Sequence, residues 1–90
     1  MAWKVELAKS AVAELDKLDP QVARRILLFL HQRVARLDNP RSIGEALKGA
    51  RLGDFWKYRV GDWRIICAIQ DNTVVVQVLH IGNRKDVYRD

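Results

Sequence analysis

The sequence predicts an α+β fold in which two N-terminal helices pack on a four-stranded, mostly antiparallel sheet, in the order β-α-α-β-β-β. Two amphipathic helical patterns follow a short alternating segment at residues 3–7 and end before residue 40. The second half of the chain holds three strand-like segments joined by short turns. A chain of 90 residues suits one modest core, so we expect a single domain over residues 1–90.

The N-terminal half is predicted to form one strand and two helices. Residues 3–7 alternate between apolar and charged side chains, as in a half-buried strand, and Ser10 is expected to cap a short first helix. Asp19-Pro20 supplies an N-cap and a first-turn proline for a second helix, which should extend to about Leu37. Asn39-Pro40 stops this helix, because a residue that precedes proline avoids helical backbone angles.

The second half is predicted to form the rest of the sheet. Residues 41–54 contain three glycines and should be a connection with a short turn at 45–47. Residues 55–60 and a strand from Trp63 should form a hairpin around Gly61-Asp62. Residues 65–69 are apolar on both faces, as in a central strand, and 73–81 should form the last strand, ended by Gly82. We expect the first strand to lie parallel to a later one, and Ile66 and Val76 to lie between sheet and helices.

The composition narrows the function classes. The net charge of +5 favours a polyanionic partner, either nucleic acid or an acidic protein. The single cysteine, Cys67, cannot form an internal disulfide, which fits a reducing cytoplasm. No apolar run approaches the roughly 18 residues of a membrane span. The sequence shows no metal-ligand spacing, Gly-rich phosphate loop or Gly-x-Ser-x-Gly motif. We therefore expect a cytoplasmic protein with no membrane association, metal or cofactor.

Cations are concentrated on the predicted hairpin. Lys57 and Arg59 are two residues apart, so they share one face of their strand, and Arg64 can join them from the next strand. A sheet face with three cations and few acids should not form core, because burying unpaired charges costs too much free energy. This face is either solvated or binds something anionic.

Two segments around these cations resemble the RelE toxins of bacterial toxin–antitoxin pairs. They are residues 47–66, with the Trp63-Arg64 hairpin, and residues 78–88, where Ile81-Gly82-Asn83-Arg84 is followed four residues later by Tyr88. The order of elements matches over essentially the whole chain. The resemblance implies the RelE-like microbial RNase fold and an endoribonuclease that cuts mRNA in the ribosomal A site, which inhibits translation. It also implies a RelB-like antitoxin, encoded beside the toxin, that holds it inactive.

By position, the resemblance implies a catalytic set of four cations and one tyrosine: Lys57, Arg59, Arg64, Arg84 and Tyr88. The further candidates for contacts to RNA and the ribosome are Lys48, Arg51 and Lys85. Arg59 stands where some members of the family have lysine, which replaces a compact charge with a planar fork of donors.

RNA can be cleaved by its own 2′-hydroxyl, which attacks the adjacent phosphorus. An enzyme must accept the 2′ proton, stabilise charge on the phosphoryl oxygens and protonate the departing 5′-oxygen. Lys57 can act as base if neighbouring cations favour its neutral form, and Arg59 and Arg64 can clamp the phosphate through paired hydrogen bonds. Arg84 can stabilise the transition state near the leaving oxygen, and Tyr88 can stack on a base.

Each candidate also has a plainer interpretation. Lys57 and Arg59 could simply be solvated surface residues. Arg64 could form an ion pair with Asp62 or Asp54, and Tyr88 could pack the tail onto the sheet. Three functions therefore stay open: a ribosome-dependent mRNA endonuclease, a ParE-like inhibitor of DNA gyrase, and a basic module that only binds nucleic acid or an acidic partner. The combined set of four cations and a tyrosine favours the nuclease.

Overall fold

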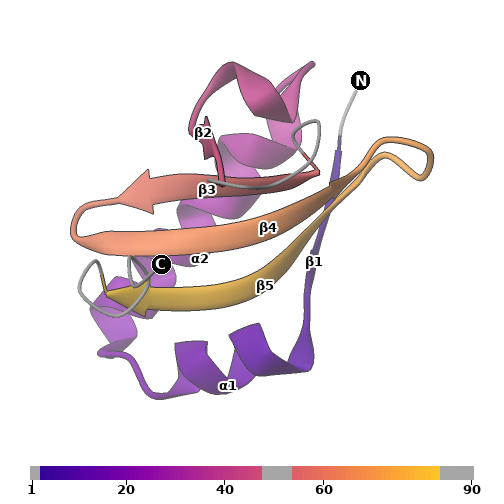
Figure 1. Cartoon of the computed structure of the whole chain (residues 1–90). Helices are drawn as coiled ribbons and strands as arrows, with labels where there is room; N and C mark the ends of the chain where they lie inside the picture. The colour runs from indigo at the N-terminus through magenta and orange to yellow at the C-terminus, as the bar shows by residue number, and fades with distance from the viewer. Residues whose placement is uncertain (1–2, 48–53, 84–90) are drawn as a thin grey trace.

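The computed structural model describes residues 3–47 and 54–83 and shows a five-stranded sheet with two α-helices packed against one face (Figure 1). The spatial order of the strands is β1-β5-β4-β3-β2. Their bounds are β1 Lys4–Leu7, β2 Glu45–Ala46, β3 Phe55–Val60, β4 Trp63–Gln70 and β5 Val75–Asn83. The helices are α1 (Lys9–Asp16) and α2 (Pro20–Gln32), and two short 3-10 turns follow, η1 (Val34–Arg36) and η2 (Pro40–Ser42). The predicted α+β class is confirmed, with one strand more than expected.

The additional strand, β2, has two residues and pairs antiparallel with β3. It lies in the stretch that was expected to be a connection with a turn at 45–47. Two residues are too few to produce an alternating pattern, so the sequence carries no periodic signal for this strand. The predicted parallel pair is confirmed, because β1 pairs with β5 in parallel register, whereas β3, β4 and β5 are antiparallel neighbours.

The start of α1 and the end of α2 differ from the prediction. α1 starts at Lys9, and Ser10 does not cap it; the Ser10 hydroxyl instead donates to the Leu79 carbonyl at 2.6 Å. The start of α2 is as predicted, because the Asp19 carboxylate accepts from the Gln21 amide at 2.9 Å. α2 ends at Gln32, and the chain tightens into η1 instead of continuing to about residue 37. Such turns are common at helix ends.

The last strand is displaced by two residues from its predicted range. Val74 has φ of +56°, so the backbone is not extended there, and β5 starts at Val75. Gly82 does not end the strand, because it pairs with Arg64 and β5 continues to Asn83. A bulge lies opposite Ile66 and Cys67, which pair with His80 and Val78. The extra residue in β5 returns the next side chain, Ile81, to the helix-facing side.

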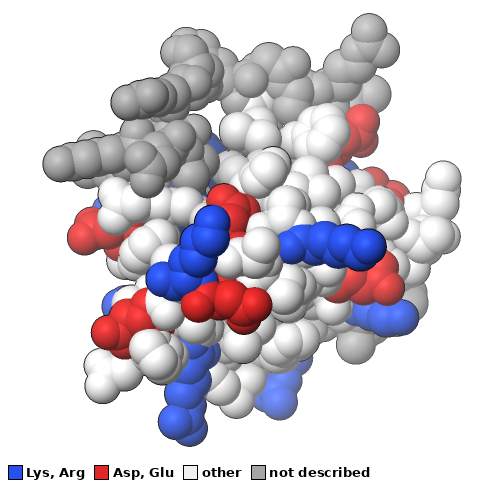
Figure 2. Space-filling model, turned by 90° about the horizontal axis from the view of Figure 1, so that it is seen from below, with Lys and Arg blue, Asp and Glu red and all other residues white. Residues whose placement is uncertain are grey.

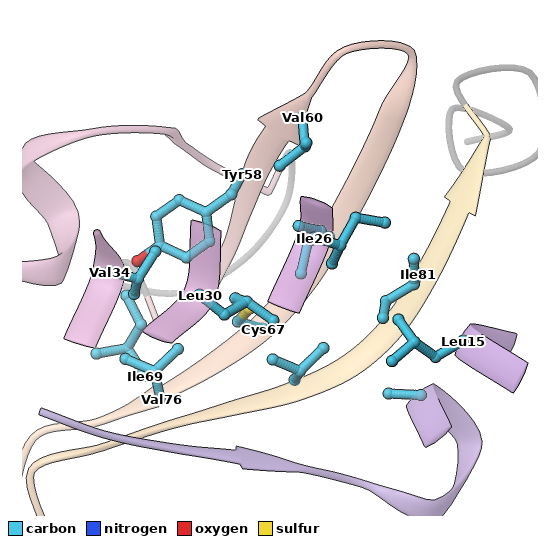
Figure 3. Close-up of a cluster of buried hydrophobic side chains, with 13 residues drawn as sticks. Leu15, Ile26, Leu30, Val34, Tyr58, Val60, Cys67, Ile69, Val76 and Ile81 are labelled. Atoms are coloured by element: carbon cyan, nitrogen blue, oxygen red, sulfur yellow. The ribbon is translucent and has the colours of Figure 1, made fainter. Parts of the chain in front are cut away.

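The core lies between the helices and the sheet face that they cover (Figure 3). Val76 is fully buried in this cluster, as predicted. Ile66 is also buried but lies on the opposite face, level with Lys57 of β3, so its predicted place between sheet and helices was wrong. Alternation along β4 explains the difference, since Ile65 and Cys67 face the helices. Burial raises the pKa of the Cys67 thiol.

The surface seen from the α1 side carries charges of both signs. Figure 2 shows lysines and arginines interspersed there with aspartates and glutamates. The described residues of this face therefore do not form a patch of one sign. Within residues 3–47 and 54–83, no helix has both the length and the apolar character needed to cross a membrane.

Candidate active site

The face of the sheet opposite the helices brings three cations together. Along β3, Tyr58 and Val60 face the core, so Lys57 and Arg59 face the other way. Arg64 of β4 is paired directly with Arg59, which places all three cations on one face, as predicted. They line a pocket of about 260 Å³, and the described residues that line it are Gly44, Glu45, Lys57, Tyr58, Arg59 and Arg64.

The three cations differ in solvent exposure. Arg59 is exposed, the Lys57 side chain is 13% exposed, and Arg64 is 5% exposed. The expectation that this face could not be buried was therefore wrong for Arg64. Its guanidinium is hydrogen-bonded, because Nη1 donates to the carbonyls of Gly61 and Trp63, both at 3.2 Å. The tight turn between β3 and β4 thus fixes the direction of one guanidinium in the pocket.

An acid that the sequence analysis did not single out also lines the pocket. Glu45 of β2 is paired in register with Lys57, and its Oε2 lies 3.7 Å from Lys57 Nζ. The Glu45 side chain is 75% exposed, so the carboxylate lies at the open rim while the ammonium is largely covered. Sequence reasoning missed Glu45 because it is twelve residues from its partner and enters the sheet through a strand of two residues.

The backbone that carries Glu45 is held by side chains from the core face of β3. The Tyr58 hydroxyl donates to the Pro40 carbonyl at 2.6 Å, and Trp56 Nε1 donates to the Ile43 carbonyl at 2.7 Å. Burial raises the pKa of Tyr58, so its hydroxyl keeps the proton that it donates. Gly44 follows with φ of +81°, and a Cβ there would lie 2.5 Å from the Lys57 carbonyl oxygen. Glycine is thus required for β2 to approach β3 this closely.

A second anchor joins the same segment to the turn between β4 and β5. Arg41 donates two hydrogen bonds to Asp71, from Nη1 to Oδ1 and from Nη2 to Oδ2, each at 2.9 Å. These bonds raise the pKa of Arg41 and lower the pKa of Asp71. The pair therefore stabilises the fold above the ordinary pKa of an aspartate, and this stability is lost as pH falls through the lowered pKa of Asp71. Because Asp71 is mostly exposed, the gain is small.

The arrangement suits an anion with several oxygens. Two guanidiniums from neighbouring strands can donate paired hydrogen bonds to a phosphate, and the ammonium adds a compact charge. Phe55 lies on the same face two residues before Lys57 and is 43% exposed, so it offers aromatic surface beside the pocket. Within the described ranges, no three His, Cys, Asp or Glu side chains are grouped closely enough to hold a metal ion.

Five of the predicted site residues fall outside the described residues. They are Lys48, Arg51, Arg84, Lys85 and Tyr88, and they stay predictions. The histidine nearest to them in the sequence, His80, is exposed and lies beside α1, with Nδ1 3.4 Å from Glu14 Oε1.

Comparison with known sequences gives consistent matches over nearly the whole chain. Residues 5–88 match the family described as the ParE toxin of the type II toxin–antitoxin system parDE. The chain is 28% identical to toxin RelG of Mycobacterium tuberculosis over 89 residues, which cover 99% of both chains. It is 29% identical to toxin RelE of the same organism over 87 residues, which cover 97% of this chain and 87% of that one.

Solved structures share the fold. The M. tuberculosis toxin–antitoxin complex RelBE2 contains a chain that matches with a TM-score of 0.81 and 24% identity over 93% of each chain. A mutant of E. coli toxin RelE in the free state matches with a TM-score of 0.78 and 25% identity, over 97% of this chain and 88% of that one. The archaeal RelE–RelB complex of Pyrococcus horikoshii matches with a TM-score of 0.71 and 25% identity over all of both chains.

Proposed function

This chain belongs to the ParE toxin family of type II toxin–antitoxin systems, and from this premise we propose that it is a RelE-like, ribosome-dependent endoribonuclease that cuts mRNA in the A site. The observation that carries the proposal is the convergence of Lys57, Arg59 and Arg64 on one pocket in the face of the sheet opposite the helices. A phosphodiester is the part of RNA that such a pocket suits best.

In the proposed reaction, the 2′-oxygen attacks phosphorus and the bond to the 5′-oxygen breaks. The products are a 2′,3′-cyclic phosphate upstream and a 5′-hydroxyl downstream. Arg59 and Arg64 hold the phosphoryl oxygens, whose charge grows in the transition state. Arg64 is well placed for this task because the turn carbonyls already fix its guanidinium.

Proton transfer is assigned to the remaining members of the set. One group must accept the 2′ proton and another must protonate the 5′-oxygen. Lys57 lines the same pocket as the two arginines and can serve either as base or as an additional charge. Arg84 is proposed to stabilise the leaving oxygen, and Tyr88 to stack on a base next to the cut.

Two kinds of partner follow from this function. The solved RelB–RelE complexes support a RelB-like antitoxin as the partner that inhibits this toxin. Lys48, Arg51 and Lys85 are proposed to contact RNA and the ribosome, which would position the mRNA over the pocket. A substrate aligned by the ribosome needs less positioning by a protein of this size.

An assay with two targets tests this function against its rival. Purified toxin is added to ribosomes programmed with a defined mRNA, and cut sites are mapped by primer extension; the same protein is added to DNA gyrase in a supercoiling assay. We expect cuts in the A-site codon and unaffected supercoiling. The matching family is the ParE toxins, so gyrase inhibition is the second candidate. Inhibited supercoiling with intact A-site mRNA would overturn the nuclease and establish that candidate.

A further inference from the structure

Within residues 3–47 and 54–83, Glu45 is the one carboxylate that lines the pocket of Lys57, Arg59 and Arg64. It lies opposite Lys57 on the neighbouring strand, 3.7 Å from the ammonium, with most of the carboxylate exposed at the rim. An acid in this position works against the binding of a phosphate. The proposed reaction assigns a role to each cation of the pocket but none to Glu45.

The position of Glu45 is set by several independent contacts. Gly44, directly before it, takes a left-handed conformation that brings the backbone against β3. The hydrogen bonds from Tyr58 to the Pro40 carbonyl and from Trp56 to the Ile43 carbonyl hold the preceding segment. β2 then pairs with β3, which puts the carboxylate level with Lys57. The carboxylate is thus held beside the pocket by the same strand, β3, that carries two of its cations.

We propose that Glu45 is a specificity-determining residue that weakens the binding of free RNA to this pocket. The proposal rests on the proposed function. A phosphodiester in the pocket brings a second negative charge close to the carboxylate, and Lys57 must exchange Glu45 for the phosphate. This cost opposes binding of RNA that nothing else holds in place. RNA on the ribosome has additional contacts whose binding free energy offsets this repulsion. Cleavage is therefore confined to ribosome-bound mRNA.

The test measures RNA affinity in a charge-matched pair of variants. Glu45→Gln removes the charge and keeps the shape. Glu6→Gln is the control, because Glu6 is also an exposed strand glutamate in an ion pair with lysine, 3.4 Å from Lys4. The probe is a fluorescent single-stranded RNA with 2′-O-methyl groups, which the proposed chemistry cannot cut. At low salt we expect Glu45→Gln to bind about three- to tenfold more tightly than wild type, the effect of Coulomb repulsion between two charges roughly 5 Å apart in a high dielectric. Glu6→Gln should change affinity far less, and the gain should shrink as salt rises.

A second readout separates this role from catalysis. Each protein is assayed on unmodified free RNA and on programmed ribosomes. The ratio of the cleavage rate on free RNA to the rate on ribosomes should be higher for Glu45→Gln than for wild type. Unchanged affinity, or an equal gain in Glu6→Gln, would overturn the proposal. Normal affinity with lost ribosomal cleavage would also overturn it and make Glu45 part of the chemistry.

Thermal unfolding shows whether Glu45→Gln is folded, and Glu45→Ala replaces it if it is not. Wild-type toxin that does not cut ribosomal mRNA refutes the proposed nuclease, while the affinity comparison still decides whether Glu45 repels RNA.

Discussion

Replacing Lys57 with methionine is expected to slow cleavage of mRNA on programmed ribosomes by roughly 10²–10³-fold, the effect of losing one well-placed group that stabilises transition-state charge. Methionine keeps the length of a side chain that is only 13% exposed, so it preserves the packing while it removes the charge. The exposed partner Glu45 makes the ion pair weak, so we expect the free energy of unfolding to change by no more than about 1 kcal/mol. Single-turnover rates and urea unfolding measure the two quantities.

The control for this variant is Lys4→Met. Lys4 is another strand lysine with a glutamate partner, on β1 rather than in the pocket. Its replacement changes the net charge equally and should leave the cleavage rate within about twofold of wild type, because a distant surface charge is screened. Equal losses in both variants would mean that overall charge, not the pocket, governs activity. A fully active Lys57→Met would remove Lys57 from the site.

Gly44→Ala is expected to destabilise the protein by about 2–5 kcal/mol. The left-handed backbone at φ of +81° costs an alanine about 1–2 kcal/mol, and overpacking adds about 1–3 kcal/mol. The new Cβ would lie 2.5 Å from the Lys57 carbonyl oxygen and 2.7 Å from Trp56 Nε1. Because β2 must move away to relieve this contact, the variant should also lose cleavage activity. Equilibrium unfolding in urea measures the change in stability.

Gly61→Ala separates the two contributions. Gly61 has a similar φ of +59°, but a Cβ there would meet the guanidinium of Arg25 at 3.4 Å, the flexible end of a side chain. Only the conformational cost of about 1–2 kcal/mol is expected. If Gly44→Ala were no worse than Gly61→Ala, the close approach of β2 to β3 would not be a stabilising feature of the fold.

Most of the fold could be predicted from the sequence because its elements are long enough to show a period. The hairpin of β3 and β4 and the cap of α2 at Asp19 follow from local patterns. A parallel partner for the first strand was expected, but no local pattern showed that this partner is β5. The bulge in β5 could not be predicted, because it depends on how that strand meets β4 rather than on a repeat of its own. The side chain of Ile66 was misplaced for a related reason: a strand that is apolar on both faces does not show which face meets the helices.

The candidate site was predictable only where its members are close in sequence. Lys57, Arg59 and Arg64 lie within eight residues on one hairpin, and alternation alone puts them on one face. Glu45 reaches them through a two-residue strand, which tertiary contacts to Trp56 and Tyr58 hold in place. The burial of Arg64 was also unexpected, because it depends on carbonyls of the turn that accept from its guanidinium.

The most direct test of the proposed chemistry is an mRNA with a single 2′-deoxynucleotide on the 5′ side of the mapped cut. The toxin acts on ribosomes programmed with this mRNA or with the all-ribose control, and the ends of the products are analysed. Attack by the 2′-hydroxyl predicts that the control yields a 2′,3′-cyclic phosphate and a 5′-hydroxyl, and that the single deoxy substitution abolishes cleavage at that site. Continued cutting at the deoxy position would contradict the account, because the oxygen proposed as nucleophile is absent there.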